Sequence, residues 1–112
     1  MTVATSKSKT PMAVADSIIN KPAPKKILII GGGYAGFYTA WKLEKTLKKG
    51  EAEVTMVDPL PYMTYQPFLP EVAAGSIEPR HAVVSHRKHR KKTNLVSGKL
   101  TKVNHKLRKA TI

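Results

Sequence analysis

The stretch Ile-Leu-Ile-Ile-Gly-Gly-Gly-Tyr-Ala-Gly, residues 27–36, is the clearest indication of the fold in this sequence. Its first four residues are apolar at every position, a pattern typical of a parallel strand buried on both faces in the middle of a sheet. Apolar residues then recur at helical spacing from Gly36 to Leu47, and Gly50 is placed to end that helix in a left-handed conformation. A second apolar strand spans residues 54–57. We therefore predict a β-α-β unit over residues 26–58, with a right-handed crossover.

The glycines of this stretch follow the pattern Gly31-x-Gly33-x-x-Gly36 between the strand and the helix. Gly31 permits a tight turn out of the strand, Gly33 lets a pyrophosphate approach the backbone, and Gly36 lets the helix lie close to the sheet. The first helical turn, with Tyr34 and Ala35, has unpaired N–H groups that favour an anion together with the helix dipole. The pattern predicts a dinucleotide site. Glycines that serve only a tight strand-to-helix turn are the alternative that stays open.

An acidic residue stands at the end of the second predicted strand. Asp58 lies 22 residues beyond Gly36, close to the spacing at which a carboxylate accepts hydrogen bonds from the hydroxyls of an adenosine ribose. Its negative charge would repel a 2′-phosphate, which disfavours NADP at this site. Asp before Pro also opens turns, so a purely structural role for Asp58 stays open.

The rest of the chain is interpreted from composition and periodicity. Residues 1–24 are rich in Ser, Thr, Ala, Lys and Pro, and we expect them to form a flexible N-terminal tail. Residues 59–70 hold four prolines, so we expect an ordered loop that is neither helix nor strand. We further expect a helical turn at 71–75, a basic helix at 80–92, and a small β-hairpin that alternates around Leu100 and Val103, turns at 104–106 and begins its second strand at Ala110.

Composition limits the chemistry that the chain can carry. It has no cysteine, which excludes disulfides, thiolate zinc sites and a redox-active cysteine pair. No apolar run of about 20 residues could span a bilayer and no secretory signal peptide is recognisable, so a cytoplasmic location is the default. The net charge is +13, and no acidic residue follows Glu78. Such a field attracts phosphate backbones, anionic lipid headgroups or acidic partner surfaces.

A longer pattern follows Asp58. Residues 65–75, Tyr-Gln-Pro-Phe-Leu-Pro-Glu-Val-Ala-Ala-Gly, resemble the Phe-Gln-Pro-Leu-Leu-like stretch and the Glu-Val-Ala-x-Gly of the type II NADH dehydrogenase family. Pro79-Arg80-His81 and residues 94–103 extend the resemblance, which covers about residues 25–112. Members of this family are two-Rossmann FAD/NAD(P)-binding flavoproteins of the pyridine nucleotide-disulfide oxidoreductase fold. The chain departs from the family pattern at Pro61, Met63 and Ser85.

The resemblance implies an α/β fold, a Rossmann-like three-layer FAD-binding domain that starts with the β-α-β unit and adds the small β-hairpin. The glycine turn and the acid at the end of the second strand would hold the adenosine and pyrophosphate of FAD. Gln66-Pro67 would lie against the isoalloxazine ring, and Leu100 beside the adenine. The implied cofactor-binding residues are Gly31, Gly33, Tyr34, Ala35, Gly36, Asp58, Gln66, Pro67 and Leu100. No catalytic residue and no metal ligand is assigned.

The implied activity is hydride transfer from NADH or NADPH to FAD, followed by electron transfer to a quinone. NADH and quinone are therefore the expected partners of the complete enzyme. A peripheral position on the inner face of the cell membrane and a homo-oligomer remain open. The 112 residues show no second glycine pattern for NADH, no later FAD motif and no C-terminal membrane-binding region. We therefore expect residues 25–112 to be the N-terminal part of an incomplete FAD-binding domain that lacks the NADH domain and the C-terminal region.

The basic and histidine-rich segment also suggests other functions. A direct nucleic-acid role is disfavoured, because the basic stretch 80–92 has no interleaved aromatic residues for base stacking. A membrane-surface role stays open, since a polybasic patch gains roughly 1 kcal/mol per charge near anionic lipid. His86 and His89 have helical spacing suited to a metal, but their neighbours are cations. A non-catalytic NAD- or FAD-binding module also stays open.

Overall fold

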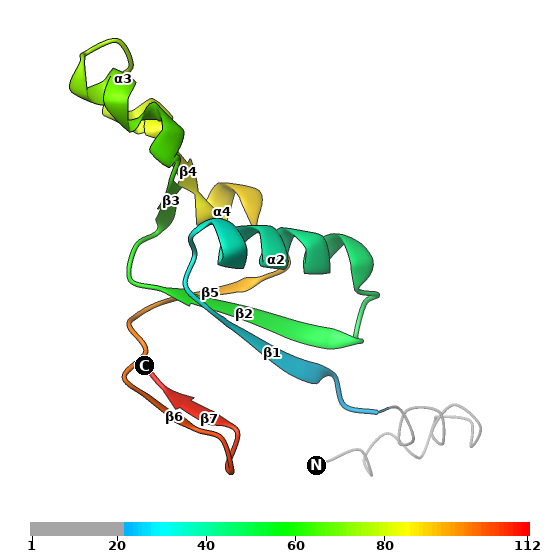
Figure 1. Ribbon diagram of the computed structural model, residues 1–112. Coiled ribbons are helices and arrows are strands. Elements are labelled where there is room, and N and C mark those ends of the chain that lie inside the picture. The colour runs from blue at the N-terminus through cyan, green and yellow to red at the C-terminus, as the bar shows by residue number, and fades with distance from the viewer. Residues whose placement is uncertain (1–21) are drawn as a thin grey trace.

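The computed structural model describes residues 22–112, and its centre is a parallel sheet. Strand β1 (Lys25–Ile30) leads through the glycine turn into helix α2 (Tyr34–Thr46), and β2 (Ala52–Asp58) returns parallel to β1. A third strand, β5 (Asn94–Ser97), pairs in parallel with the other side of β2, which gives the order β1-β2-β5 (Figure 1). The predicted β-α-β unit is confirmed. The predicted N-terminal tail lies outside the described residues except for residues 22–24.

The core lies between α2 and one face of this sheet. Ala40 of α2 is completely buried and belongs to the core cluster with residues of β1 and β2. The apolar side chains of β1 and β2 that point towards α2 form the rest of the buried cluster, with half-buried side chains around it. Its buried members are Ile29, Ala40, Val54 and Met56, and its half-buried members are Ile27, Leu43, Leu47 and Leu95. The apolar positions predicted by the helical and strand periodicities therefore pack together in one layer between α2 and the sheet.

The position of β1 in the sheet differs from the prediction. We expected a central strand buried on both faces, but within residues 22–112 β1 is at the edge of the sheet and β2 is central. Leu28 and Ile30, on the face of β1 opposite α2, keep 43% and 46% of their surface exposed. The prediction was wrong because an apolar run reports how buried a strand can be, whereas its place in the sheet depends on which segments pair with it.

The proline-rich segment contains more regular structure than predicted. Strand β3 (Tyr62–Thr64) pairs antiparallel with β4 (Val83–Ser85), and a 3-10 turn, η2 (Gln66–Phe68), follows it. The expectation of neither helix nor strand over 59–70 was wrong, because the prolines flank β3 and leave its three N–H groups free to pair. The expected helical turn is present as α3 (Leu69–Ala73).

The predicted basic helix over 80–92 is also wrong. A 3-10 turn, η3 (Pro79–Ala82), leads into β4, and only the four residues of α4 (His86–His89) are helical. The β-branched pair Val83-Val84 favours a strand, and β3 supplies its partner. Ser85 then starts the short helix, since its hydroxyl accepts a hydrogen bond from the Lys88 N–H at 3.4 Å.

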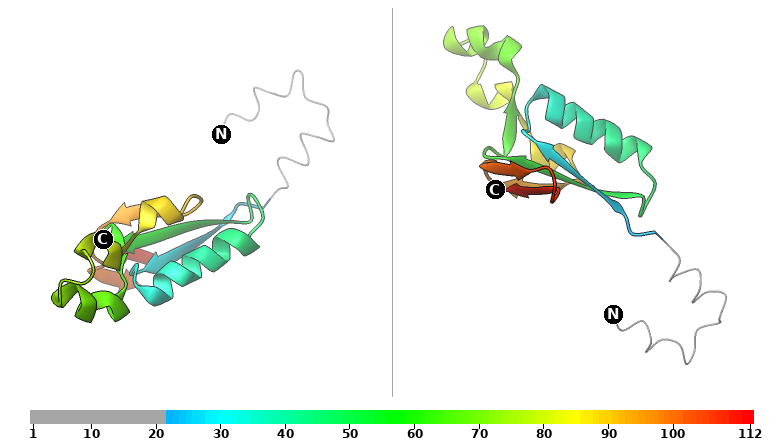
Figure 2. Two further views of the ribbon diagram at one scale, coloured as in Figure 1. Left: turned by 90° about the horizontal axis from the view of Figure 1, so that it is seen from above. Right: turned by 60° about the horizontal axis from the view of Figure 1, so that its bottom comes forward.

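The C-terminal hairpin was predicted correctly. Strands β6 (Lys102–Asn104) and β7 (Lys109–Thr111) pair antiparallel. The hairpin lies on the side of the sheet away from α2 (Figure 2), and together with Leu28 and Ile30 it lines an open hollow of about 340 Å³. Within residues 22–112, no helix is long and apolar enough to cross a membrane.

Candidate nucleotide site

The glycine turn joins the carboxyl end of β1 to α2, and its geometry requires two of its glycines. Gly31 has φ +93°, in the left-handed region that favours glycine, and its N–H donates to the Val57 carbonyl at 2.8 Å. A Cβ on Gly36 would overlap the Gly31 carbonyl oxygen and would lie 3.2 Å from the Ile29 Cγ2. Gly31 therefore allows the tight turn, and Gly36 allows the close contact between α2 and the turn, as expected.

The outer side of the same turn is open. Gly33 is the N-cap of α2, with no side chain capping the helix and no acidic residue in its first turn. No atom lies within 4 Å of the position that a Cβ on Gly33 would take, and Gly33, Tyr34 and Ala35 are exposed. The N–H groups of the first turn have no acceptor inside an α-helix. They lie at the positive end of a 13-residue helix, where a negative charge is favoured.

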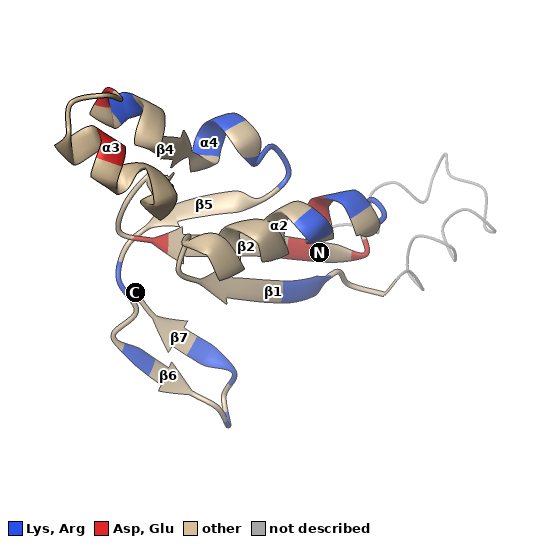
Figure 3. Ribbon diagram, turned by 45° about the horizontal axis from the view of Figure 1, so that its top comes forward, with Lys and Arg blue, Asp and Glu red and all other residues tan. Residues whose placement is uncertain are grey.

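The basic residues of α2 lie away from the glycine turn. Figure 3 shows the Lys and Arg residues of α2 towards its C-terminal end, and other basic residues on α4, in the loop after α4 and on the hairpin. No Lys or Arg occurs between Lys26 and Lys42 in the sequence, although Arg90 contacts Phe37 in the first turn of α2. The turn itself would therefore offer an anion backbone N–H groups and no basic side chain of its own.

Asp58, the last residue of β2, lies directly beside the turn. Its Oδ2 accepts a hydrogen bond from the Gly32 N–H at 2.6 Å, and its Oδ1 accepts one from the Leu60 N–H at 2.7 Å. The Leu60 contact is the turn-opening bond of the structural alternative, so Asp58 serves the turn whatever else it does. Each carboxylate oxygen keeps a further lone pair, and Asp58 is only half-buried. The carboxylate is fixed in place and can still accept bonds from hydroxyl groups.

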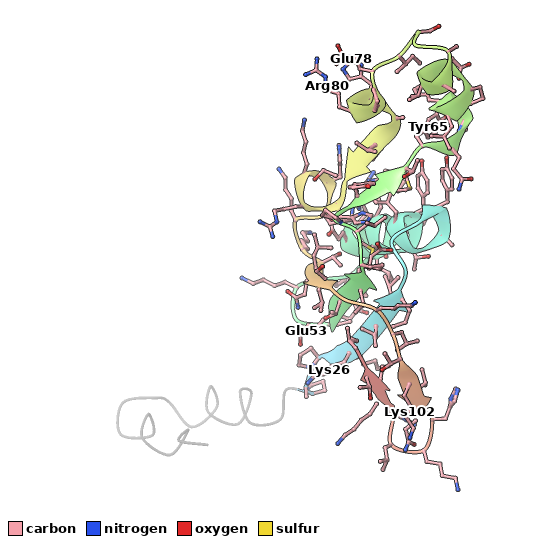
Figure 4. The ribbon with its side chains drawn as sticks, turned by 90° about the vertical axis from the view of Figure 1, so that its left-hand side faces the viewer. Lys26, Glu53, Tyr65, Glu78, Arg80 and Lys102 are labelled. Carbon is pink, nitrogen blue, oxygen red and sulfur yellow. The ribbon has the colours of Figure 1, made fainter. Side chains whose placement is uncertain are left out.

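The other predicted contact residues lie at different distances from this turn. Gln66 comes close to it, because its N–H donates to the Tyr34 hydroxyl at 3.1 Å. Tyr34 and Tyr65 also pack edge to face, with their ring centroids 6.4 Å apart. Tyr65 lies at the base of the projecting α3 segment (Figure 4). Pro67 is exposed in the same 3-10 turn. Leu100 is half-buried in the segment between β5 and β6.

A buried polar cluster behind the turn was not predicted. Arg90 is 5% exposed, with its guanidinium 4.5 Å from the centre of the Phe37 ring and its Nη1 3.9 Å from Glu44 Oε2. Oε1 of Glu44 accepts three bonds from Thr93 and Lys92, of which the shortest comes from the Thr93 hydroxyl at 2.7 Å. Burial opposes ionisation of Glu44, but these bonds and Arg90 outweigh it and hold its pKa below the ordinary value. Burial lowers the pKa of Arg90, while Glu44 raises it.

His86 belongs to the same cluster and reaches the glycine turn. It is 2% exposed, and its ring lies against Gly32, where a Cβ would come within 2.7 Å of the His86 Cε1. Gly32, which is not one of the motif glycines, therefore has a packing role that the motif does not reveal. The signal available in the sequence was the spacing of His86 and His89, which suits a metal but has cationic neighbours that disfavour one. In the structure the His86 ring contacts Gly32 and Phe37.

The strand, glycine turn, helix and terminal acid define a dinucleotide-binding fold of a known class. Residues 25–112 match the family model described as pyridine nucleotide-disulphide oxidoreductase, and the chain belongs to this family. Within it, the chain is similar to proteins named type II NADH:quinone oxidoreductase. It is 35% identical over 91 residues to that of Staphylococcus saprophyticus and 33% identical over 87 residues to that of Staphylococcus aureus strain bovine RF122. Each comparison covers 76% of this chain and 22% of the relative, so the chain spans about a fifth of their length.

Solved structures agree on the fold. The NDH2 of Plasmodium falciparum in complex with RYL-552 matches with a TM-score of 0.64, covering 74% of this chain and 17% of that one. The NDH2 of the same organism in complex with NADH matches with a TM-score of 0.63, covering 73% and 17%. Both are 24% identical in sequence. The resemblance to type II NADH dehydrogenases and the Rossmann-like α/β fold are confirmed.

Proposed function

We propose that residues 25–112 form the FAD-binding segment of an NADH:quinone oxidoreductase-like flavoprotein. The observation that carries the proposal is the fixed carboxylate of Asp58 beside the open, uncapped end of α2. These two features suit the two ends of an adenosine diphosphate unit, whose ribose offers hydroxyl donors and whose pyrophosphate carries negative charge. The family match and the names of the relatives support the choice of a flavoprotein over other dinucleotide binders.

Each residue of the site has a defined task in this proposal. The N–H groups at Gly33, Tyr34 and Ala35 bind the pyrophosphate. The pyrophosphate can approach this backbone closely because Gly33 has no Cβ. Gly31 and Gly36 shape the turn so that these groups face outward. Asp58 accepts the hydroxyls of the adenosine ribose, with Gly32 and Leu60 holding its orientation.

The flavin end is assigned by family resemblance. Gln66 and Pro67 lie against the isoalloxazine ring, where the hydrogen bond from Gln66 to Tyr34 ties their loop to the pyrophosphate end of the site. Leu100 lies beside the adenine. When bound, FAD supplies the hydride-accepting chemistry, and the protein fixes its position. We further propose, from the names of the relatives, that the whole protein takes hydride from NADH and reduces a quinone.

The test is FAD binding by the chain and by Asp58→Asn. The purified protein should show flavin absorbance near about 370 and 450 nm. Hydrogen bonds to a charged group contribute about 1.5–3 kcal/mol, so Asp58→Asn should bind FAD about 10- to 100-fold more weakly. Glu53→Gln is the matched control, because Glu53 is an exposed carboxylate on the same strand and glutamine can keep its bond from Asn94.

Two results would contradict the proposal. One is a wild-type chain that binds no FAD, and the other is an Asp58→Asn variant that binds FAD as tightly as Glu53→Gln does. A parallel titration with NAD⁺ tests the alternative function, a non-catalytic NAD-binding module. Such a module would bind NAD⁺ more tightly than FAD.

A further inference from the structure

His86 connects three parts of the nucleotide site. It starts α4, and its N–H donates to the Pro61 carbonyl at 3.0 Å, in the segment that follows Asp58. Its ring lies against Gly32, whose N–H is the donor to Asp58. The ring also lies close to Phe37 of α2, with ring centroids 5.9 Å apart. The imidazole therefore packs against both the helix and the glycine turn.

The ring has no hydrogen-bond partner in this position. Neither Nδ1 nor Nε2 is paired with any group in residues 22–112, although the side chain is almost fully buried. It lines a cavity of about 90 Å³ that Asp58, Arg87 and Ser97 also line. A buried polar group without a partner is costly, and in native proteins it usually has a function.

The charges around His86 are mixed. Burial lowers its pKa, Asp58 from β2 raises it, and Arg90 from α4 lowers it. Arg87 shares the cavity, and His89 of the same helix stacks on Phe37 with the ring centroids 6.4 Å apart. Glu44 of α2 faces Arg90 and partly offsets its charge. Burial, the largest of these effects, lowers the pKa of His86 and so favours the neutral imidazole in the free protein, next to the place where an anion is expected.

We propose that His86 is a positioning residue of the nucleotide site, which takes up a proton from solvent when a pyrophosphate binds at the glycine turn and then strengthens that binding. The inference rests on the proposed function. A pyrophosphate on the N–H groups of Gly33 and Tyr34 places two negative charges next to the peptide of Gly32, against which the ring lies. In a partly buried site these charges favour the imidazolium over the neutral ring.

Proton uptake and affinity are linked. If binding raises the pKa of His86 by about one unit, the nucleotide binds about tenfold more tightly to the protonated protein. The gain appears as the pH falls through the pKa of the complex, and it is complete below the pKa of the free protein, which burial holds under 6.5. Affinity should therefore rise as the pH falls from 8 to about 5.5.

The experiment measures binding of ADP-ribose to the full chain by calorimetry between pH 5.5 and 8. Its pyrophosphate is esterified at both ends and has no group that titrates in this range, so any pH dependence belongs to the protein. We expect wild type to bind more tightly at pH 5.5 than at pH 8, by up to about tenfold, and His86→Leu to bind equally at both. His89→Leu is the matched control, because His89 is an exposed histidine of the same helix, and this variant should keep the wild-type profile.

A second measurement does not depend on a variant that folds. Wild-type titrations near pH 6.5 in two buffers of different ionisation enthalpy report the protons taken up on binding, and we expect a fractional uptake. No uptake, or a His86→Leu variant with the full wild-type pH profile, would overturn the role of His86 while the proposed function stands. If wild type binds neither ADP-ribose nor FAD at any pH, that result would instead refute the proposed function, and the role of His86 with it.

Discussion

Two glycines of the same turn, Gly36 and Gly33, should respond differently to substitution by alanine, the first mainly in stability and the second mainly in FAD binding. In Gly36→Ala the new Cβ would overlap the Gly31 carbonyl, which is backbone and cannot rotate away. Overpacking of this kind costs roughly 1–3 kcal/mol or more, while the better helix propensity of alanine returns at most about 1 kcal/mol. We expect a net loss of about 2 kcal/mol, which for a domain of this size lowers the melting temperature by roughly 10 °C.

Gly33→Ala is the matched comparison. A Cβ there meets no atom within 4 Å, so the cost is the poorer N-cap, roughly 0.5–1 kcal/mol. The same Cβ would project into the space proposed for the pyrophosphate, and we expect FAD binding to weaken by more than tenfold, a rough estimate equal to about 1.4 kcal/mol.

Urea unfolding followed by circular dichroism measures the first effect, and fluorescence titration with FAD measures the second. The reasoning is refuted if Gly36→Ala is as stable as wild type, which would mean that α2 can move away from the turn without cost. It is equally refuted if Gly33→Ala binds FAD normally.

Two further predictions concern the cluster behind the turn. Thr93→Val removes the hydroxyl bond to Glu44 and should destabilise the fold by about 1–2 kcal/mol at pH 7. Because the pKa of Glu44 is lowered in the folded protein, its contribution is present above about pH 4.5 and lost as the pH falls further, so denaturation at pH 7 and pH 3 should show a smaller difference between variant and wild type at pH 3. Gly32→Ala should destabilise the fold because its Cβ would overlap the His86 ring, and the double variant Gly32→Ala/His86→Ala should recover part of that loss. Additive losses in this double-mutant cycle would show that the two residues do not interact.

Much of the fold could be predicted because its signals are local. The apolar run of β1, the helical spacing of α2 and the glycine pattern each report on adjacent residues, and all three predicted elements are present. The hairpin of β6 and β7 was also predictable, since its strands are close in sequence. The third parallel strand, β5, was missed, because only two of its four residues are apolar.

Some features of the candidate site could also be predicted from local sequence, and others could not. The sequence placed Gly31, Gly36 and Asp58 around one turn, and the backbone geometry agrees with that arrangement. Their binding roles, like those of Gln66, Pro67 and Leu100, stay predictions. The sequence did not reveal that His86 lies on Gly32 or that Arg90 reaches Glu44, because no local pattern specifies contacts between distant segments.

Local signals in the sequence were enough to predict the β-α-β unit, its tight turn at Gly31 and the acid at the end of β2, because dihedral preference and hydrophobic periodicity act over a few residues. Packing in three dimensions placed β1 at the edge of the described sheet, paired β3 with β4 and put a buried histidine behind the glycine turn. These features depend on which segments meet in space. A chain segment encodes what it can bury and which backbone shapes it can adopt, whereas its partners are selected by the packing of the whole domain.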